Sequence, residues 1–459
     1  MRITKLCGAF CALVLLVPAI GQTQSLKKAV QDALASNPEL LSASAEARAS
    51  AFELQQLESG FQPTVSLNAN AGAERVDDPS SLSAADNDTT KFRREISLDA
   101  ELVLFDGYRR ANLVYSNAAR VDGSIYVLLD AAETMALNAT EVYVDTYRHL
   151  QLQDVARRTL ARHREIGLQV DNLVESGRLP LSDKLQVQDR IRAAQLALIE
   201  VRQAGRDADA RFERIVGYRR NGPLSIPGVR GLPHNVTELI KSSVDNSYRV
   251  RVANLEINRA KFDQKVAEAD RMPRLSLNAG ASQGFNIDGA SGSQSDAFIG
   301  LRMTWTLYQG GRKAQTNALV ERRSKAISER NVAIREVREL AERTWNSYLA
   351  NNERVNVLRA QLGENRELVE QFESEFQAGT RTLLELLEVE RAMFDVEFET
   401  VSAQASLAFS AYRLLATQSK LAQYFGATAA GHTLAPDFSE RALVKPTSVF
   451  RTQIQPLSR

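Results

Sequence analysis

Two carboxylates late in the chain, Glu385 and Glu388, are spaced so that they would share one face of a helix. They follow Gly379, a predicted helix break, by six and nine residues. On the wall of a pore, such carboxylates would attract and retain cations. Spacing alone nevertheless favours an ordinary solvated helix face, so the chemistry depends on where the surrounding elements place these two side chains.

No set of residues in the sequence has the spacing of an enzyme site. The four histidines, His149, His163, His234 and His432, show no metal-ligand spacing. For His149 and His163, fourteen residues apart on a predicted helix, a solvated or interhelical role is favoured over ligation. The sequence also lacks a Walker A loop, a nucleophile elbow and a Cys/His pair. We therefore predict no catalytic residue, no metal site and no cofactor, and we expect a partner to supply any energy.

Charge and hydrophobicity argue against two broad classes of protein. The 459 residues carry a net charge of +1, and 25% of them are charged while 44% are hydrophobic. A nucleic-acid-binding protein usually carries a basic surface, which this balance does not suggest. The hydrophobic fraction argues against a wholly disordered chain. We expect a folded protein with no nucleic-acid partner.

Residues 1–21 are typical of a secretory signal peptide. Two basic residues precede the 15-residue apolar run Leu6–Ile20, and Ala19-Ile20-Gly21 at its end supplies small residues for cleavage. The run is shorter than the about 20 residues that a membrane-spanning helix needs. The only cysteines, Cys7 and Cys11, lie within it. The mature chain is therefore predicted to have neither a disulfide nor a cysteine metal site.

The chain repeats itself, and the repeat predicts its organisation. Gln62–Ala69 (QPTVSLNA) returns 210 residues later as Met272–Ala279 (MPRLSLNA). Leu104–Arg110 (LFDGYRR) returns 203 residues later as Leu307–Lys313 (LYQGGRK). Two copies of one structural unit are therefore expected.

The predicted boundaries follow this repeat. Residues 22–235 form the first structural repeat, which ends in a connector rich in glycine and proline. Residues 236–426 form the second repeat, and residues 427–459 form an irregular tail. A helix at about 26–59 in the first repeat, and at about 236–271 in the second, is expected to precede the strands.

Each repeat contains two segments in which apolar and polar residues alternate, the pattern of strands with one apolar face. The segments lie at about 65–71 and 96–105, and again at about 275–282 and 299–307. About ten residues is the length of a tilted transmembrane strand. Alternation alone fits a soluble hairpin equally well. If the strands form a barrel, polar residues are predicted to line its lumen: Ser97, Asp99, Glu101 and Arg302.

A long interval without proline follows the second strand of each repeat. The intervals Tyr108–Glu175 and Gly311–Gln377 are rich in Ala, Leu, Glu, Arg and Gln, which favour helix. About 70 helical residues span roughly 105 Å, too long for one globular core to cover. A second helical stretch returns after Gly177 and after Gly379. Each repeat is therefore predicted to contain a β-hairpin and a long antiparallel helical hairpin.

Four strands per chain cannot close a membrane barrel, because about eight are the minimum. An open edge in lipid would leave backbone groups without hydrogen-bond partners. Other copies of the chain must therefore complete the sheet, and three copies would supply twelve strands.

The order, spacing and duplication of these elements resemble the TolC family of outer-membrane export channels, over about Ser25 to Gly426. The motifs that carry the resemblance are Leu307–Arg312, at the strand-to-helix junction, and Gly379–Glu390, at the second helical tip. The resemblance implies a mixed α and β membrane protein of the Gram-negative outer membrane. It would be a homotrimer with a twelve-stranded β-barrel, four strands from each chain, continuous with a long periplasmic α-helical barrel.

The same resemblance implies partners and a gate. The partners would be outer-membrane lipid, a periplasmic adaptor (membrane-fusion) protein and an inner-membrane transporter, either ABC-type or proton-driven. Arg381 matches a family arginine that ties its tip to the neighbouring hairpin, and Asp183 matches the acidic partner region. Glu385 and Glu388 match carboxylates that ring the periplasmic entrance. Phe376 stands where the family often has tyrosine, so a hydroxyl link is not expected there.

The tip sequences resemble type I secretion members somewhat more than efflux members. We therefore predict an outer-membrane exit duct for type I protein secretion, with a small-molecule efflux component as the main alternative. A structural periplasmic coiled-coil adaptor would explain the helices but not the four strands. A soluble secreted adhesin would explain the signal peptide but not the helical hairpins of fixed length.

Overall fold

The computed structural model describes residues 24–80 and 82–426. The predicted signal peptide and the predicted tail lie outside these residues. Contacts divide the chain into two compact units. The first, here the tip unit, contains the described residues up to Ala33 together with Ala139–Val229 and Glu353–Phe409. The second, here the sheet unit, contains Leu34–Asn138, Arg230–Asn352 and the described residues from Ser410 onward.

Both repeats fold into the same order of long elements. The first contains α1 (Leu26–Ser36), α2 (Pro38–Ser59), β2 (Thr64–Arg75), β3 (Thr90–Phe105), α3 (Arg109–Glu175) and α4 (Leu181–Val216). The second contains α5 (Val236–Asn246), α6 (Tyr248–Ala269), β5 (Arg274–Phe285), the 3-10 turn η1 (Ile287–Gly289), β6 (Ser293–Thr304), α7 (Arg312–Gln377), α8 (Leu383–Thr417) and α9 (Leu421–Tyr424). The short strands β1 (Gln24–Ser25) and β4 (Leu224–Ser225) pair in parallel. The predicted mixture of long helices and strands is confirmed.

The two longest helices match the predicted intervals. Helix α3 has 67 residues and α7 has 66. Each ends before a glycine in the left-handed region, Gly177 with φ 72° and Gly379 with φ 78°. Beyond the second glycine, the Thr380 amide donates back to the Glu375 carbonyl oxygen at 3.0 Å, as in a Schellman motif. Glycine tolerates this conformation without strain, so these two residues set the lengths of the hairpins.

The helices that precede the strands are shorter than predicted. The expected helix at 26–59 is interrupted at Asn37, whose side chain accepts a hydrogen bond from the Glu39 amide at 3.0 Å. Ser247 interrupts the expected helix at 236–271 and accepts from the Val250 amide at 3.4 Å. Both residues are N-caps, which satisfy the free amides of a starting helix. Each interval therefore contains two helices instead of one.

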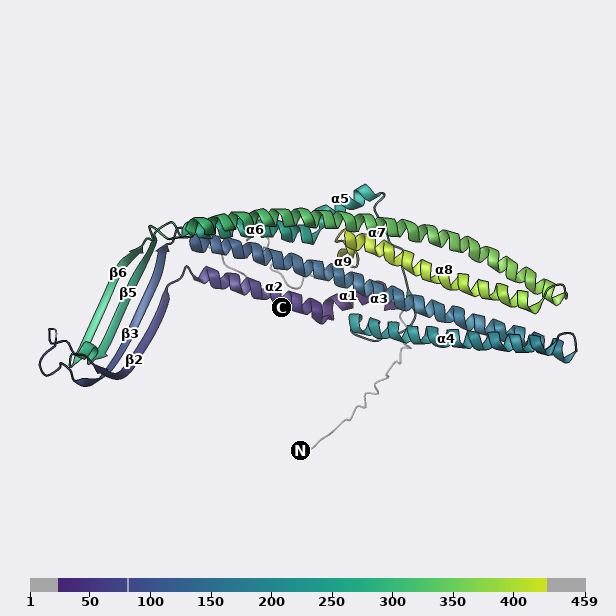
Figure 1. Cartoon of the computed structure of the whole chain (residues 1–459), viewed down its shortest axis with the longest axis horizontal. Coiled ribbons are helices and arrows are strands. Elements are labelled where there is room, and N and C mark those ends of the chain that lie inside the picture. Colours follow the sequence, from purple (N-terminus) through teal and green to yellow (C-terminus); the bar gives the residue numbers. More distant parts are fainter. Residues whose placement is uncertain (1–23, 81, 427–459) are drawn as a thin grey trace, which may run out of the picture. The chain divides into compact units, whose positions relative to one another are not determined.

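The four long strands form one antiparallel sheet in the order β2-β3-β5-β6, and Figure 1 shows them side by side. The central pair joins the two repeats, with Leu98 of β3 opposite Ala281 of β5. The outer strands, β2 and β6, each have one neighbour among the described residues. The single chain thus presents a sheet with two open edges.

One face of this sheet is apolar across all four strands. Leu67, Leu98, Ala281 and Ala297 lie on one cross-strand row. In the single chain Leu67 is 67% exposed, and Leu301 on β6 is 66% exposed. A contiguous exposed apolar surface marks a membrane or an interface contact. The predicted alternation is confirmed, and the apolar face has no cover within the described chain.

Strand β6 ends earlier than predicted. The 210-residue offset relates β2 to β5 residue for residue, and each has 12 residues. The 203-residue offset relates the start of β3 to the start of β6, but β3 has 16 residues and β6 has 12. The prediction of strand as far as Leu307 is therefore wrong for the single chain. The last residues of β3 pair with β5, whereas β6 is an edge strand with no such neighbour among the described residues. This difference accounts for the earlier end of β6.

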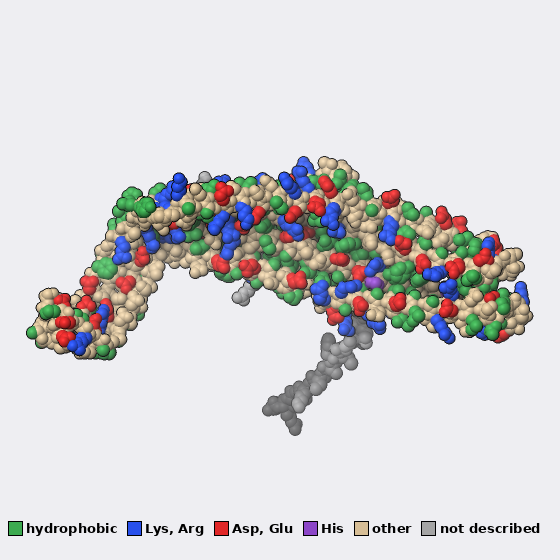
Figure 2. Space-filling view, in the orientation of Figure 1, with side chains coloured by type: hydrophobic (Ala, Val, Ile, Leu, Met, Phe, Trp, Pro, Cys, Tyr) green, Lys and Arg blue, Asp and Glu red, His purple; other side chains and the backbone are tan. Residues whose placement is uncertain are grey.

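The helices carry both charge signs outward and pack through apolar stripes. Figure 2 shows Lys and Arg side chains interspersed with Asp and Glu along them. In the sheet unit, α2 packs on the start of α3 through Leu54 and Tyr115. Over residues 24–80 and 82–426, no helix combines the length and the hydropathy needed to cross a membrane.

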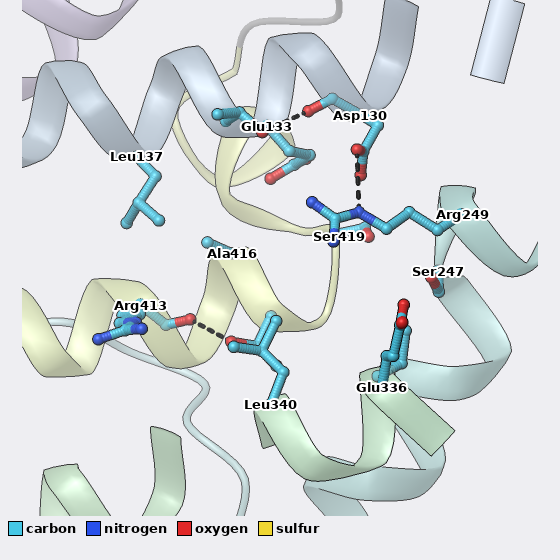
Figure 3. Close-up of a pocket in the computed structure, with 13 residues that line it drawn as sticks. Asp130, Glu133, Leu137, Ser247, Arg249, Glu336, Leu340, Arg413, Ala416 and Ser419 are labelled. Carbon is cyan, nitrogen blue, oxygen red and sulfur yellow. Dashed lines mark hydrogen bonds and ion pairs between the residues drawn. The ribbon is translucent and has the colours of Figure 1, made fainter. Parts of the chain in front are cut away.

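A buried carboxylate holds the end of the described chain in the sheet unit. Glu133 of α3 accepts hydrogen bonds from the amides of Leu421 and Ala422, at 2.9 and 3.3 Å. It lines a cavity of about 360 Å³ near Asp130, which pairs with Arg249 at 3.2 Å (Figure 3). Burial raises the pKa of Glu133 to about 7, although the two amide hydrogen bonds oppose the rise.

This carboxylate predicts a dependence of stability on pH. Because the folded pKa of Glu133 lies above its ordinary value, its contribution is complete below about pH 4.5 and is lost as the pH rises through about 7. We expect Glu133→Gln, which keeps an acceptor for the two amides, to stabilise the protein at pH 8 by roughly 1–3 kcal/mol. Glu133→Ala, which removes the acceptor, should destabilise it by about 0.5–2 kcal/mol. Thermal unfolding of the detergent-solubilised protein at pH 5 and pH 8 tests this, and equal pH dependence in wild type and Glu133→Gln would contradict it.

Candidate functional site

The tips of the two helical hairpins pack on one another within the tip unit. Ile166 and Val170 of α3 and Val187 of α4 form one buried cluster with residues of the second hairpin. Phe376 of α7 belongs to this cluster and is 7% exposed, beside Leu386 of α8. Position 376 therefore contributes apolar packing between the hairpins. The absence of a hydroxyl group there agrees with the packing.

Arg381 lies in the turn between α7 and α8 and contacts both sides of its own tip. Its guanidinium group lies 2.7 Å from a carboxylate oxygen of Glu375 and 3.1 Å from one of Glu385. The guanidinium carbon lies 4.1 Å from the ring centroid of Phe372, a cation–π distance. Arg381 thus links the end of α7 to the start of α8 within one chain.

Glu385 also forms a capping box with Thr382 at the start of α8. Its carboxylate accepts from the Thr382 amide at 3.0 Å and from the Thr382 hydroxyl at 2.7 Å. The Thr382 hydroxyl oxygen in turn accepts from the Glu385 amide at 3.3 Å. This reciprocal arrangement satisfies free amides of a starting helix. The sequence analysis did not identify it, although the T-x-x-E spacing of residues 382–385 is its signature.

These contacts keep the tip carboxylates charged. Hydrogen bonds from Thr382, then the ion pair with Arg381, lower the pKa of Glu385 to about 2. Hydrogen bonds from Gln371 and then from Arg381 lower the pKa of Glu375. Hydrogen bonds to Glu375 and Glu385 raise the pKa of Arg381. At neutral pH the tip therefore carries fixed charges that are already paired locally.

Glu388 has a partner on the other hairpin. Its carboxylate lies 3.1 Å from the Arg190 guanidinium of α4, and its side chain is 56% exposed. The two carboxylates that the sequence groups together thus have different cation partners. Each would need to leave that partner, or share it, to hold a mobile cation.

Asp183 lies in the first turn of α4, where an acidic side chain is favoured at the helix N-terminus. Its amide donates to the Pro180 carbonyl oxygen at 3.1 Å, and its carboxylate accepts a long contact from Ser182 at 3.4 Å. Among the described residues of the chain, no ion pair joins Asp183 to Arg381. Of the four predicted gate residues, the structure brings together Arg381 and Glu385.

A further charge cluster joins the two hairpins and was not predicted. Arg162 of α3 contacts Glu390 of α8 at 2.8 Å and Glu373 of α7 at 2.5 Å. Burial opposes the charge on Arg162, but hydrogen bonds from Arg162 to Glu390 and Glu373 outweigh it and raise the pKa of Arg162. Arg158 of α3 adds an ion pair with Glu397 of α8 at 2.7 Å. No local sequence signal marks these pairs, because the partners are more than 200 residues apart in the chain.

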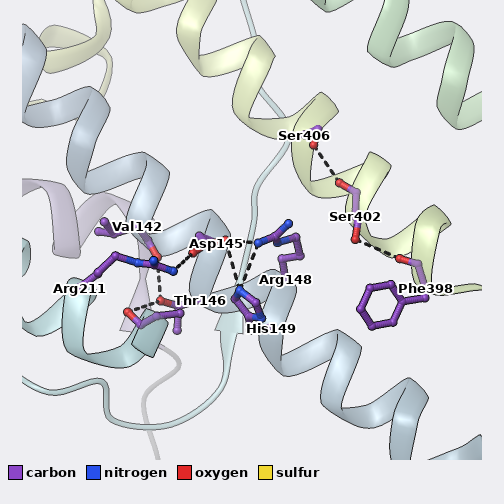
Figure 4. A network of polar contacts seen from close by, with 10 residues as sticks. Val142, Asp145, Thr146, Arg148, His149, Arg211, Phe398, Ser402 and Ser406 are labelled. Carbon is purple, nitrogen blue, oxygen red and sulfur yellow. Dashed lines mark hydrogen bonds and ion pairs between the residues drawn. The ribbon is translucent and has the colours of Figure 1, made fainter. Parts of the chain in front are cut away.

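The histidines of the long helix have structural surroundings. His149 lies 3.1 Å from Arg148, in a network where Asp145 pairs with Arg211 of α4 at 2.8 Å (Figure 4). Burial lowers the pKa of His149. His163 is 5% exposed, with a ring nitrogen 2.9 Å from the Thr159 carbonyl oxygen. Within the described ranges, no group of three or more His, Cys, Asp or Glu side chains could hold a metal ion.

The predicted lumen residues share the polar face of the sheet. Ser97, Asp99 and Glu101 alternate along β3, and Arg302 of β6 lies opposite Ser276, which lies opposite Val103 of β3. Asn68 of β2 donates to Asp99 at 3.1 Å. Glu101 pairs with Arg274 at 3.1 Å. All four candidates therefore lie on the face opposite Leu98 and Leu301.

Comparisons with known proteins agree with this architecture. Residues 29–218 and 239–417 match the family model described as outer membrane efflux protein. The outer membrane efflux protein BepC of Brucella suis biovar 1 (strain 1330) is 23% identical over 397 residues, which cover 86% of this chain and 85% of BepC. The alkaline protease secretion protein AprF of Pseudomonas aeruginosa is 22% identical over 356 residues, covering 74% and 71%.

Solved structures show the same fold. The outer-membrane channel OprN superposes with a TM-score of 0.74 at 19% identity, covering 86% of this chain and 89% of OprN. The matches to the family model lie in both repeats and cover most of the chain. The family resemblance inferred from the motifs is thereby confirmed, as is the outer-membrane location. The chain belongs to the outer membrane efflux protein family, whose members are outer-membrane channels and not enzymes.

Proposed function

We propose that this chain forms, as a homotrimer, the outer-membrane exit duct of a type I protein secretion system. The observation that carries the proposal is the four-stranded sheet, which has one exposed apolar face and two open edges. Such edges are costly in lipid unless they are paired. Three copies would supply twelve strands, enough for a barrel that encloses a lumen. Ser97, Asp99, Glu101 and Arg302 would line that lumen.

The helical hairpins would form the periplasmic part of the duct. Their tips would be the closable end, recruited by a periplasmic adaptor and an inner-membrane transporter of the ABC type. Arg381 supports this proposal because it lies at the tip and holds two acidic side chains of the α7–α8 turn. Asp183 would pair with an arginine of a neighbouring copy, since it has no ion-pair partner among the described residues of its own chain.

The proposal that the cargo is a polypeptide rests on similarity to particular members of the family. A polypeptide exit duct is favoured by the tip sequences and by the similarity to AprF, whose name describes protease secretion. The second candidate is a small-molecule efflux pump with a proton-driven transporter, favoured by the similarity to BepC, an efflux protein by name. Both functions use the same duct and differ in the recruiting transporter.

Loss of the tip arginine should open the channel. We expect Arg381→Ala to raise single-channel conductance in planar bilayers, because the α7–α8 turn loses its link to Glu375 and Glu385. The gain should be modest, since the pairs are accessible to solvent and salt. Thr382→Ala, which removes the hydroxyl of the capping box but keeps the ion pair, is the matched control. Equal conductance in wild type and Arg381→Ala would count against a gate at this residue, and a gain with Asp183→Asn would support its pairing across copies.

Removal of the tip carboxylates should weaken cation block. We expect Glu385→Gln combined with Glu388→Gln to raise the concentration of a multivalent cation needed to block the channel from the periplasmic side. Glutamine at 385 can still serve in the capping box, so the charge changes while the helix start is kept. Arg381→Ala should act in the opposite direction, because it frees Glu385 from its cation. Unchanged block in the double variant would return both carboxylates to a structural role.

The cargo proposal is tested in cells that lack this chain. We expect the deletion to abolish appearance of a large secreted protein in the medium, and to leave the susceptibility to small toxic compounds unchanged. Complementation with the intact chain should restore secretion. A secreted proteome that is unaffected, together with increased susceptibility, would select the efflux alternative.

A further inference from the structure

The two strand-to-helix junctions are copies of one another that differ in charge. In the first, Leu104–Arg110, Asp106 accepts a hydrogen bond from Arg110 at 2.8 Å, and both side chains are about 85% covered, being 14% and 15% exposed. Arg109 lies 3.2 Å from Asp270, which belongs to the turn between α6 and β5. Both cations of the first junction are therefore paired.

The second junction, Leu307–Lys313, lacks both acids. Gln309 stands where the first junction has Asp106, and Gly60 stands where the second repeat has Asp270. Arg312 donates to neutral oxygens, those of Thr306 at 3.3 Å and of Gln309 at 3.2 Å. Within residues 24–80 and 82–426, neither Arg312 nor Lys313 has a carboxylate partner. In a neighbouring copy, β2 would pair with β6 as β5 pairs with β3. The residue brought toward Arg312 would then be Gly60, which is not an acid.

A third cation adjoins this junction. The Trp305 indole donates to the Arg271 carbonyl oxygen at 3.1 Å, and the Arg271 side chain contacts the Thr316 hydroxyl at 3.5 Å. Leu307 is 77% exposed and Tyr308 is 88% exposed. In the single chain, large exposed apolar side chains and cations without a carboxylate partner thus share one stretch, which follows β6 directly.

We propose that Arg271 and residues 305–313, here called the basic collar, bind the phosphate headgroup of an anionic glycerophospholipid in the leaflet that faces the periplasm. The inference rests on the proposed membrane-spanning sheet. Guanidinium groups match the paired oxygens of a phosphodiester. Aromatic side chains are enriched where a membrane protein leaves the hydrocarbon region, and cations near an anionic surface add affinity.

The repeat supplies a matched pair of variants. Gln309→Asp places at the second junction the acid that already neutralises Arg110 at the first, so it removes net charge without removing a cation. Arg271→Gln, Arg312→Gln and Lys313→Gln together remove the cations themselves. Arg109→Gln, at the neutral first junction, is the control. Native mass spectrometry of the full-length protein in detergent, with added phosphatidylglycerol or phosphatidylcholine, measures which lipid is retained.

We expect the wild type and Arg109→Gln to retain phosphatidylglycerol in preference to phosphatidylcholine. Gln309→Asp should lose about fivefold of that preference, and the triple variant about a hundredfold. Undiminished preference in both variants would overturn the inference, and so would equal retention of the two lipids by the wild type. Displacement of the lipid by millimolar inorganic phosphate would also overturn it, because the site would then bind small anions. If the protein inserts and conducts but shows no lipid preference, only the inference of lipid binding by the basic collar is contradicted. If the protein fails to partition into membranes, the proposed duct is contradicted.

Discussion

Unpaired strand edges are the constraint on which the rest of this structure depends. The sheet exposes an apolar face that includes Leu67, Leu98 and Leu301, yet β2 and β6 each have one neighbour within the described chain. In lipid, every backbone amide and carbonyl group must find a partner inside the protein. A sheet whose apolar face contacts lipid can therefore keep its backbone groups paired only if further strands complete its two edges. The early end of β6, compared with its doubly paired counterpart β3, is a local consequence of the same constraint.

The charged side chains at the hairpin tips form ion pairs with nearby residues. Arg381 holds Glu375 and Glu385, Arg190 holds Glu388, and the tip carboxylates remain charged at neutral pH. Exposed ion pairs of this kind are individually weak. Apolar packing around Phe376 therefore contributes much of the stability of the contact between the two hairpins. If the tips form the proposed gate, several weak pairs over a packed core would let a partner open it without unfolding the hairpins.

The sequence carries most of the architecture because the architecture is periodic and duplicated. Alternation over 96–105 predicts a strand, the proline-free interval after Tyr108 predicts a long helix, and the repeat offsets carry the strand starts from one half to the other. Helix breaks at Asn37 and Ser247 were missed, although both are capping residues whose signal is local. Contacts such as Arg162 with Glu390 and Glu133 with Leu421 leave no pattern, because tertiary packing alone brings these partners together.

The central claim, that neighbouring copies join β6 to β2, is tested most directly by disulfide formation across that edge. Ala100 of β3 lies opposite Ala279 of β5, and the repeat offsets carry this pair to Met303 of one copy and Ala69 of the next. After oxidation of the membrane-inserted Ala69→Cys, Met303→Cys variant, a covalent trimer should appear on a denaturing gel. The control Asn70→Cys, Met303→Cys, whose side chains belong to opposite faces, should not crosslink. Folded, membrane-inserted protein that stays monomeric on the gel, or that crosslinks equally in both variants, would contradict the account.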